Sequence, residues 1–353
     1  MKSTSAALAA HLAGPVTTLA TCWRISRVDG KEFFFTDHDR DLSFEGKVYK
    51  ASSGYSRTAI ANDSSLSVDN LDVEGVFDSA AITEEELRAG LFDQAEVRIF
   101  LVNWTDPSMG SLRMRRGWFG EVVLTEEGVF RTELRGMTQA LQQRIGELYS
   151  SECRADLGDH RCKVPVNPPE IGRTIAYAIG DVVRVATAGG IGSAIYANRH
   201  YRCVVAGITA PVQPAYATTV GEETTDGSAV FLAEEAWSRS GLVTEVTDRA
   251  SFTAAIDEPR AVDGWFAGGV LTWETGANAG RSIEVKSWTQ ATGQLELFLP
   301  MGYMIASGDA FRIHPGCDKR LDTCIDRFAN VLNFRGEPYV PGQDALMSYP
   351  DAR

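Results

Sequence analysis

The sequence has no long apolar run and is poor in basic residues. No stretch approaches the roughly 18 apolar residues of a membrane-spanning helix, so no membrane span is expected. The 34 lysines and arginines are outnumbered by 47 aspartates and glutamates, which gives a net charge of −13. Because nucleic-acid binding needs a basic surface that releases counterions, we expect no specific nucleic-acid binding.

Local signatures of catalysis are also missing. The sequence has no nucleophile elbow and no recognisable serine triad, and none of its five histidines stands in the H-E-x-x-H pattern of zinc proteases. The acidic runs Glu84-Glu85-Glu86 and Glu234-Glu235 are more typical of solvated charge than of acid–base catalysis. We therefore expect that the protein is not an enzyme.

Two further motifs are incomplete. Asp37 to Asp41 imitates the start of a calcium loop, but Leu42 and Val48 occupy the positions that require glycine and glutamate. The glycines of 189–192 lack the third glycine of a dinucleotide-binding turn. Both segments are interpreted as turns.

The N-terminus has only part of the pattern of a signal peptide. His11 and Gly14-Pro15 interrupt the apolar run, which favours a short amphipathic helix over residues 3–13. The chain is then expected to fold in a reducing cytoplasm, where thiols stay free or bind metal.

The patterning predicts a mainly β protein with minor α content. At 353 residues, two or three domains are expected, and 33 glycines with 13 prolines indicate many turns. Strands are predicted at residues 22–25, 32–35, 48–49, 95–104, 120–124, 129–135, 179–186, 201–205 and 230–232. A capping box at Thr83–Leu87 predicts a short helix that ends at Gly90, and a second helix is predicted at about 138–148.

Four cysteines form two matched pairs in polar surroundings. Eight residues separate Cys153 from Cys162, six separate Cys317 from Cys324, and 154 lie between the pairs. Zinc knuckles use closer spacings, of about two to four residues, so the wide gaps favour an iron–sulfur cluster over zinc, and zinc over disulfides. Nearby cations could offset the negative charge of such a cluster: Arg154, Arg161, Lys163, Lys319 and Arg320. His160 is a weaker candidate ligand.

Several segments together resemble a known family. They are Phe35–Leu42, Ser67–Leu71, Ala155–Gly158, Leu271–Trp273, Gly276–Arg281, Gly316–Arg320, Thr323-Cys324 and Asn333–Gly336. This combination resembles the baseplate hub proteins of alphaproteobacterial siphophages and gene transfer agents, which are similar to the tail-tip protein L of phage lambda. The resemblance covers nearly the whole chain outside residues 170–245.

The resemblance implies a 4Fe–4S cluster held by Cys153, Cys162, Cys317 and Cys324, with zinc as the alternative metal. In the lambda protein the second cysteine pair follows soon after the first, unlike here. Cys22 and Cys203 match no ligand position and are expected to be plain thiols. The cluster would tie the end of the hub domain to the C-terminal tail.

The resemblance also implies a domain plan. Residues 1–150 would carry two barrel-like hub modules, and residues 151–167 and 314–353 the cysteine-ligated region and tail. Residues 168–245 would form a small inserted β module, and 246–313 a further β-rich domain. An alternative function is carbohydrate binding by the 168–245 insertion, with Tyr216 and Trp237 stacking on sugar rings, although a role in the module's own core is favoured.

The function implied is structural. Three chains would form a ring in the virion tail baseplate, assembled in the host bacterial cytoplasm, that adapts a sixfold tail end to a threefold tip and surrounds the DNA exit channel. The implied partners are a distal tail ring protein and a central tip or fibre protein. A cell-wall peptidase of the tail tip and a glycan are further candidates.

Overall fold

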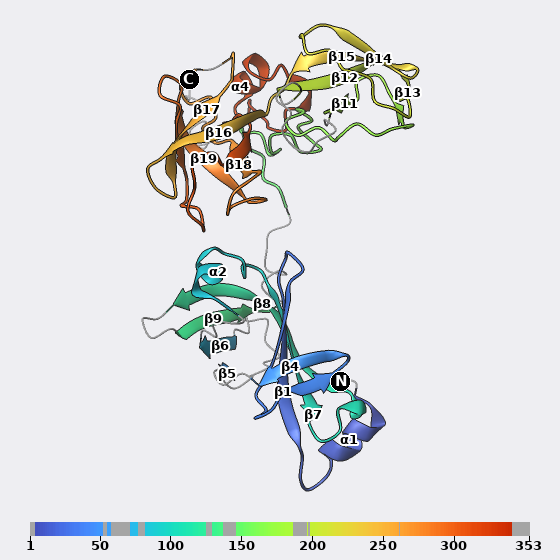
Figure 1. The fold of residues 1–353 in the computed structure, drawn as a ribbon, viewed down its shortest axis with the longest axis vertical. Coiled ribbons are helices and arrows are strands. Elements are labelled where there is room, and N and C mark those ends of the chain that lie inside the picture. Colours follow the sequence, from blue (N-terminus) through green and yellow to red (C-terminus); the bar gives the residue numbers. More distant parts are fainter. Residues whose placement is uncertain are drawn as a thin grey trace, which may run out of the picture. The chain divides into compact units, whose positions relative to one another are not determined.

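The computed structural model describes residues 4–51, 55–57, 71–76, 82–124, 129–136, 146–185, 196, 198–260 and 262–340. For 55–57, 71–76, 121–124, 129–131 and 133 it describes the backbone alone. The chain forms two compact units, Met1–Ile145 and Gly146–Arg353. Short strands dominate both units, which confirms the predicted mainly β fold with minor α content (Figure 1).

The N-terminal unit is built on a nine-stranded sheet with the order β3-β4-β2-β1-β7-β8-β9-β6-β5. All neighbours pair antiparallel except β2 and β4, which are parallel. The strands are β1 (Leu19–Ser26), β2 (Glu32–Thr36), β3 (Leu42–Phe44), β4 (Lys47–Ala51), β5 (Tyr55–Arg57), β6 (Leu71–Val76), β7 (Glu96–Asn103), β8 (Ser111–Leu124) and β9 (Val129–Arg135).

Short helices flank this sheet. The predicted N-terminal helix is present as α1 (Ala6–Leu12), where Ser5 accepts a hydrogen bond from the Leu8 N–H. The predicted capping box is confirmed in α2 (Glu84–Arg88), because the Thr83 hydroxyl accepts a hydrogen bond from the Glu86 N–H at 3.1 Å. A single 3-10 turn, η1 (Pro107–Met109), precedes β8. For the predicted 138–148 helix, residues 138–145 lie outside the described residues and 146–148 are not helical.

Two hydrophobic clusters use opposite faces of the sheet. Along β1, Trp23 and Ile25 belong to one cluster and Ala20 and Cys22 to the other, as the twofold alternation of a strand requires. The region expected to carry two barrel-like modules has one strand order, which neither shows nor excludes such modules. The 14-residue strand β8 pairs with both β7 and β9, and register shifts in both pairings let it bend, so one continuous sheet results.

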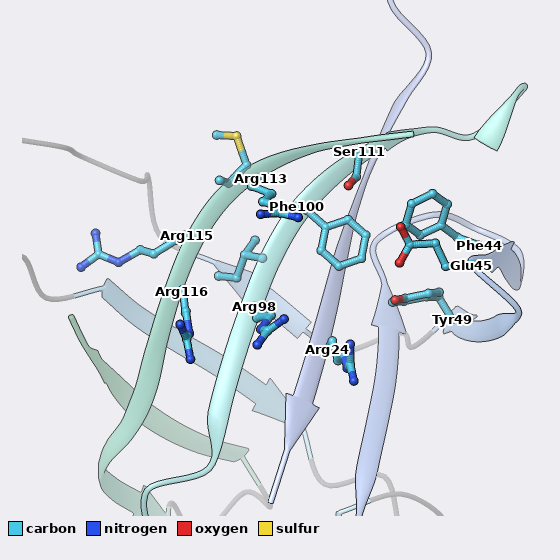
Figure 2. A pocket seen from close by; sticks show the side chains of 12 residues that line it. Arg24, Phe44, Glu45, Tyr49, Arg98, Phe100, Ser111, Arg113, Arg115 and Arg116 are labelled. Carbon is cyan, nitrogen blue, oxygen red and sulfur yellow. The ribbon is translucent and has the colours of Figure 1, made fainter. Parts of the chain in front are cut away.

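The register of this sheet aligns three arginines. Arg24 of β1 stands opposite Arg98 of β7, and Arg98 stands opposite Arg116 of β8. Figure 2 shows these side chains in a row across the three strands. Like charges directly opposite each other destabilise a sheet, so this row needs compensation from elsewhere.

The C-terminal unit contains a four-stranded sheet and a two-stranded one. The larger has the order β11-β12-β15-β14, and β10 pairs with β13. The strands are β10 (Ala176–Tyr177), β11 (Val182–Val183), β12 (Arg199–Val205), β13 (Gly207–Ile208), β14 (Glu223–Asp226) and β15 (Ala229–Glu235). The strand predicted at 179–186 is wrong in its length: Gly180 has a φ of +96° and the Asp181 carboxylate accepts a hydrogen bond from the Ala178 N–H, which makes a turn. Residue 186 lies outside the described residues.

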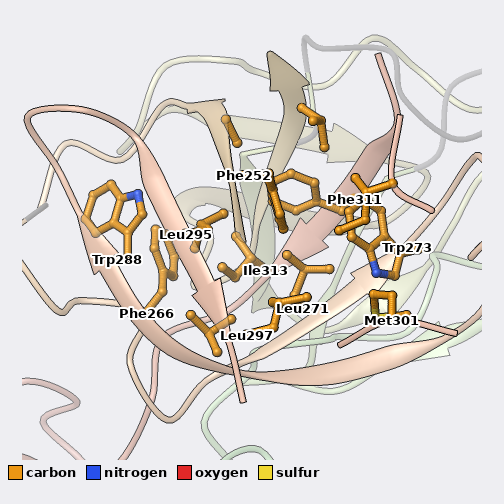
Figure 3. Packing of buried hydrophobic residues seen from close by; sticks show 14 of the residues in the cluster. Phe252, Phe266, Leu271, Trp273, Trp288, Leu295, Leu297, Met301, Phe311 and Ile313 are labelled. Carbon is orange, nitrogen blue, oxygen red and sulfur yellow. The ribbon is translucent and has the colours of Figure 1, made fainter. Parts of the chain in front are cut away.

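A closed six-stranded barrel follows, with the order β16-β17-β20-β19-β18-β21. Its interior is filled by large side chains, including Phe252, Trp273 and Phe311, whose ring centroids lie 5.5 to 5.8 Å apart (Figure 3). The strands are β16 (Arg239–Val246), β17 (Ser251–Ile256), β18 (Val270–Trp273), β19 (Ser282–Thr289), β20 (Gln294–Leu297) and β21 (Ala310–Ile313). Helix α4 (Leu321–Asp326) and the 3-10 turn η2 (Val331–Asn333) come after the barrel.

A buried ion network joins the four-stranded sheet to the barrel. Arg239 at the start of β16 is fully buried and bonds Glu235 at 2.6 Å and Glu258 at 2.9 Å. Arg260 adds a second partner to Glu258, at 2.8 Å. Since buried charges need partners, these contacts fix how the sheet and the barrel meet.

Candidate metal centre

The four cysteines of the two pairs converge on one cavity. Its lining includes all of Cys153, Cys162, Cys317 and Cys324, together with apolar, amide and arginine side chains: Ala155, Leu157, Val164, Phe328, Asn330, Asn333 and Arg320. The void is about 10 Å³, roughly the room of one water molecule. All four side chains are free thiols, and none forms a disulfide. Residues far apart in the sequence therefore meet at one point of the fold.

A tight loop positions the first pair. The carboxylate of Asp159 accepts hydrogen bonds from the N–H groups of Cys162 at 2.6 Å, Arg161 at 2.9 Å and Asp156 at 3.1 Å. Although desolvation opposes it, this set of donors lowers the pKa of Asp159 to about 2. The charged carboxylate thus folds the segment between the two cysteines.

A helix start positions the second pair. Asp318, next to Cys317, accepts hydrogen bonds from the Arg320 N–H at 3.1 Å and the Thr323 hydroxyl at 2.9 Å. Lys319 takes a φ of +65°, and α4 then carries Cys324 toward the cavity. The six-residue spacing corresponds to a turn followed by the first half of this helix.

Direct hydrogen bonds also connect the segment around the first cysteine pair with the segment around the second pair. The Cys153 N–H donates to the Lys319 carbonyl at 2.8 Å, and the Lys319 ammonium donates to the Ala155 carbonyl at 2.6 Å. Farther along, Arg154 makes a two-pronged ion pair with Glu337, at 2.5 and 2.8 Å. The polypeptide itself therefore joins residues 153–155 to the segment after the barrel.

Two sulfur atoms accept hydrogen bonds from the C-terminal segment. The Arg335 N–H donates to Cys153 Sγ at 3.3 Å, and the Asn330 side-chain amide lies 3.6 Å from Cys162 Sγ. The same amide donates to the Cys162 carbonyl at 2.5 Å. Hydrogen bonds of this kind orient ligands and tune the potential of iron–sulfur clusters.

Burial favours the protonated form of two of these thiols, Cys317 and Cys324. Desolvation raises the pKa of Cys324 to about 11, and the neighbouring Cys153, Cys162 and Cys317 raise it further. Desolvation likewise raises the pKa of Cys317. A bound cation would reverse this preference, since metal coordination deprotonates thiols outright.

The donor set fits a metal centre, although the arrangement is not a preformed single-ion site. In the described part of the chain, no three His, Cys, Asp or Glu side chains are placed to hold one metal ion. Zinc requires sulfurs about 2.3 Å from one point. A four-iron cluster is a larger body that thiolates reach from separate corners, and four thiols are its usual complete ligand set.

The surrounding residues partly match expectation. Arg320 is the one of the five expected cations that lines the cavity, whereas His160 is exposed and absent from its lining. Cys22 and Cys203 are buried in other hydrophobic clusters. The sequence analysis did not identify Asp159 as the residue that holds the first cysteine loop. The signal for it was an aspartate three residues before Cys162.

The aromatic residues considered for sugar stacking are engaged elsewhere. Tyr216 is 4% exposed in the core of the four-stranded module, and its hydroxyl donates to Asp226 at 2.6 Å. This confirms the structural reading of Tyr216. Trp237 instead packs on Phe328 beside the cysteine cavity and stacks under the Arg260 guanidinium.

Comparison with known proteins agrees with this architecture. Residues 5–165 match the family model "Baseplate hub protein, N-terminal attachment domain", and residues 264–344 match "Phage conserved hypothetical protein BR0599". A chain of the solved structure "Virion of native gene transfer agent (GTA) particle" is 32% identical, with a TM-score of 0.68 over 99% of this chain and 97% of that chain. The protein belongs to the baseplate hub family.

The hub assignment confirms the family predicted from the sequence and places the protein in the virion tail baseplate. Cys153 and Cys162 lie in the first matched range, Cys317 and Cys324 lie in the second, and residues 166–263 fall between the two ranges. No curated protein matches the hub sequence. Among its described helices, none is long and apolar enough to cross a membrane.

Proposed function

We propose that three copies of this hub form a ring at the end of a phage or gene-transfer-agent tail. The ring would adapt the sixfold tail end to a threefold tip or fibre protein, contact a distal tail ring protein, and surround the DNA exit channel. The observation that carries this proposal is the match to a virion chain over 99% of the hub. Cyclic symmetry would close three copies into a ring without open interfaces.

The charge of the hub suits a position around moving DNA. With a net charge of −13, its surface repels phosphate overall and would let DNA pass without binding. The role is structural rather than catalytic, as for the family. A cell-wall peptidase of the tail tip would then be a separate protein attached nearby.

Stoichiometry within assembled particles tests the ring. Quantitative mass spectrometry of purified tails should give three hub copies per tail, and the released complex should have three times the chain mass of 38.4 kDa. Six copies, or a monomer that never enters particles, would contradict the proposal. Cross-linking of intact tails would identify the ring and tip neighbours.

We further propose that Cys153, Cys162, Cys317 and Cys324 hold a 4Fe–4S cluster with a structural role. Bound there, the cluster would add covalent links between the segment before the four-stranded module and the segment after the barrel. The support is the convergence of four free thiols, two of which accept hydrogen bonds. No catalysis is assigned to it.

Metal analysis of anaerobically purified hub tests this assignment. The protein should be brown, with broad visible absorbance and about four irons per chain. A colourless protein with one zinc per chain would replace the cluster by the zinc alternative. Protein without metal and with disulfides between these cysteines would contradict both.

A further inference from the structure

Arginines gather in one cleft of the N-terminal unit. Twelve residues line a cavity of about 340 Å³, of which five are arginines and one is a glutamate: Arg24, Arg98, Arg113, Arg115, Arg116 and Glu45. The whole chain has 13 more acidic than basic residues. The cleft therefore carries mostly positive side chains although the chain as a whole is acidic.

The cross-strand row forms the first half of this cleft. Arg24, Arg98 and Arg116 stand side by side and are 38, 51 and 52% exposed. Two carboxylates compensate three guanidiniums, because Glu32 bonds Arg24 and Glu96 bonds both other arginines. One positive charge of the row remains uncompensated by these pairs.

A register shift brings further arginines to the cleft. Between Ile99 and Phe100 the pairing of β7 with β8 slips by one residue, so that Ile99 stands opposite Arg115 and Phe100 opposite Arg113. Bulges of this kind re-aim side chains and are common beside functional sites. Arg113 is exposed, which leaves its guanidinium accessible to a ligand.

An aromatic wall faces the arginines. Phe44 and Tyr49 come from the β3–β4 hairpin and pack with Phe100, at centroid distances of 5.6 Å each. Figure 2 shows Phe44, Glu45 and Tyr49 across the cleft from the arginine-bearing strands. These three rings are buried and support the cleft, so the arginines supply its binding groups, and Glu45 makes it less suited to a continuous phosphate backbone.

We propose that this cleft binds an acidic, extended segment of another tail protein. Guanidinium groups bind carboxylates through two parallel hydrogen bonds. A row of guanidinium groups can therefore bind several carboxylates of one extended segment. The buried aromatic rings would hold the opposite wall of the cleft in place. The proposal rests on the proposed hub function, since only an assembled tail supplies such a partner.

Binding of the full-length hub to a fluorescent peptide of alternating glutamate and serine tests the cleft chemistry. We expect saturable binding that weakens about tenfold or more with Arg113→Glu and falls with added salt. The control is Arg88→Glu, which makes the same charge change on α2, outside the cleft. Equal losses in both variants, no binding, or tighter binding of a charge-matched DNA oligonucleotide would overturn the proposal.

Zero-length carbodiimide coupling in purified tails tests the partner. With Arg113→Lys, the introduced amine should couple to an aspartate or glutamate of a different tail protein, whereas Arg88→Lys should not. Coupling only within the hub, or to a second hub copy, would refute an acidic partner. If the hub is present in tails but does not couple to another protein, the cleft proposal is wrong and the hub function stands. If the wild-type hub is absent from tails, the hub function itself is contradicted.

Discussion

At the scale of single residues, Cys324 tests the proposed metal centre. It lies on α4 among three other thiols, so Cys324→Ser removes one of the four proposed ligands without changing the helix. We expect metal affinity to fall at least about tenfold, because mutation of residues that only hydrogen-bond to metal ligands already lowers affinity by about that factor. Iron per chain and resistance to a chelator measure this. Cys203→Ala is the matched control, because that thiol is buried in another cluster, and equal iron loss in both variants would contradict the ligand assignment.

The sequence was most informative at this scale. Spacing and polar context singled out four of six cysteines, and the structure brings those four together. What it could not supply was the hydrogen-bonding shell. Asn330 and Arg335 reach the sulfurs only because the segment after α4 folds back over the first cysteine loop. That return is a long-range contact, which local patterns do not encode.

At the scale of elements, the four-stranded sheet should respond to acid through Glu234. Desolvation opposes it, but contacts with His200 and Arg202 lower the pKa of Glu234 to about 2 from 4.5. Because the pKa is lower in the folded state, ionised Glu234 stabilises the fold at pH values above the pKa of the unfolded chain. This stabilisation is lost as the pH falls from about 4.5 toward 2. We expect Glu234→Gln to remove up to about 3 kcal/mol of this acid dependence.

Urea unfolding of the four-stranded sheet measures this pH dependence of the unfolding free energy. It is followed at several pH values between about 2 and 7, which covers the titration of Glu234. The exposed Glu223 on β14 provides the control variant Glu223→Gln. If Glu234→Gln and the wild type lose stability in parallel as the pH falls, the ion pairs of Glu234 do not carry the effect.

The start of the barrel carries a buried ion pair. Glu258 has no exposed side-chain area and pairs with the fully buried Arg239. Glu258→Ala leaves the buried Arg239 with Glu235 as a remaining carboxylate partner, so the variant should cost about 2 kcal/mol of unfolding free energy, less than for a pair with no other partner. The double variant Arg239→Met with Glu258→Leu should recover part of that loss, because Glu235 and Arg260 then each lose one partner. Glu296→Gln, at the exposed pair with Lys286, should change little, and an equal cost there would contradict the burial argument.

Element prediction succeeded where patterns were local. The alternation at Glu96–Asn103, the hairpin strands 120–124 and 129–135, and the capping box at Thr83 all appear in the structure. Local patterns say nothing of register. The row of Arg24, Arg98 and Arg116 exists only through the pairing of strands that lie far apart in the sequence.

At the scale of the whole molecule, the two units should respond differently to metal removal. Unit Met1–Ile145 has its own clusters on its sheet, whereas all four cysteines belong to unit Gly146–Arg353. Binding energy of a metal that only the folded state holds adds to folding stability. Anaerobic chelation should therefore lower the unfolding midpoint of the C-terminal unit and leave that of the N-terminal unit unchanged.

Hydrogen exchange followed by mass spectrometry separates the two units in the intact chain. After chelation, faster exchange is expected around residues 153–162 and 317–335, where the two segments meet, while the exchange of β1 and β7 stays constant. The direct hydrogen bonds between the segments, including the Arg154 to Glu337 pair, should keep them in partial contact. Uniform acceleration along the whole chain would mean that the metal supports global folding, and no change would mean that the polypeptide contacts alone join the segments.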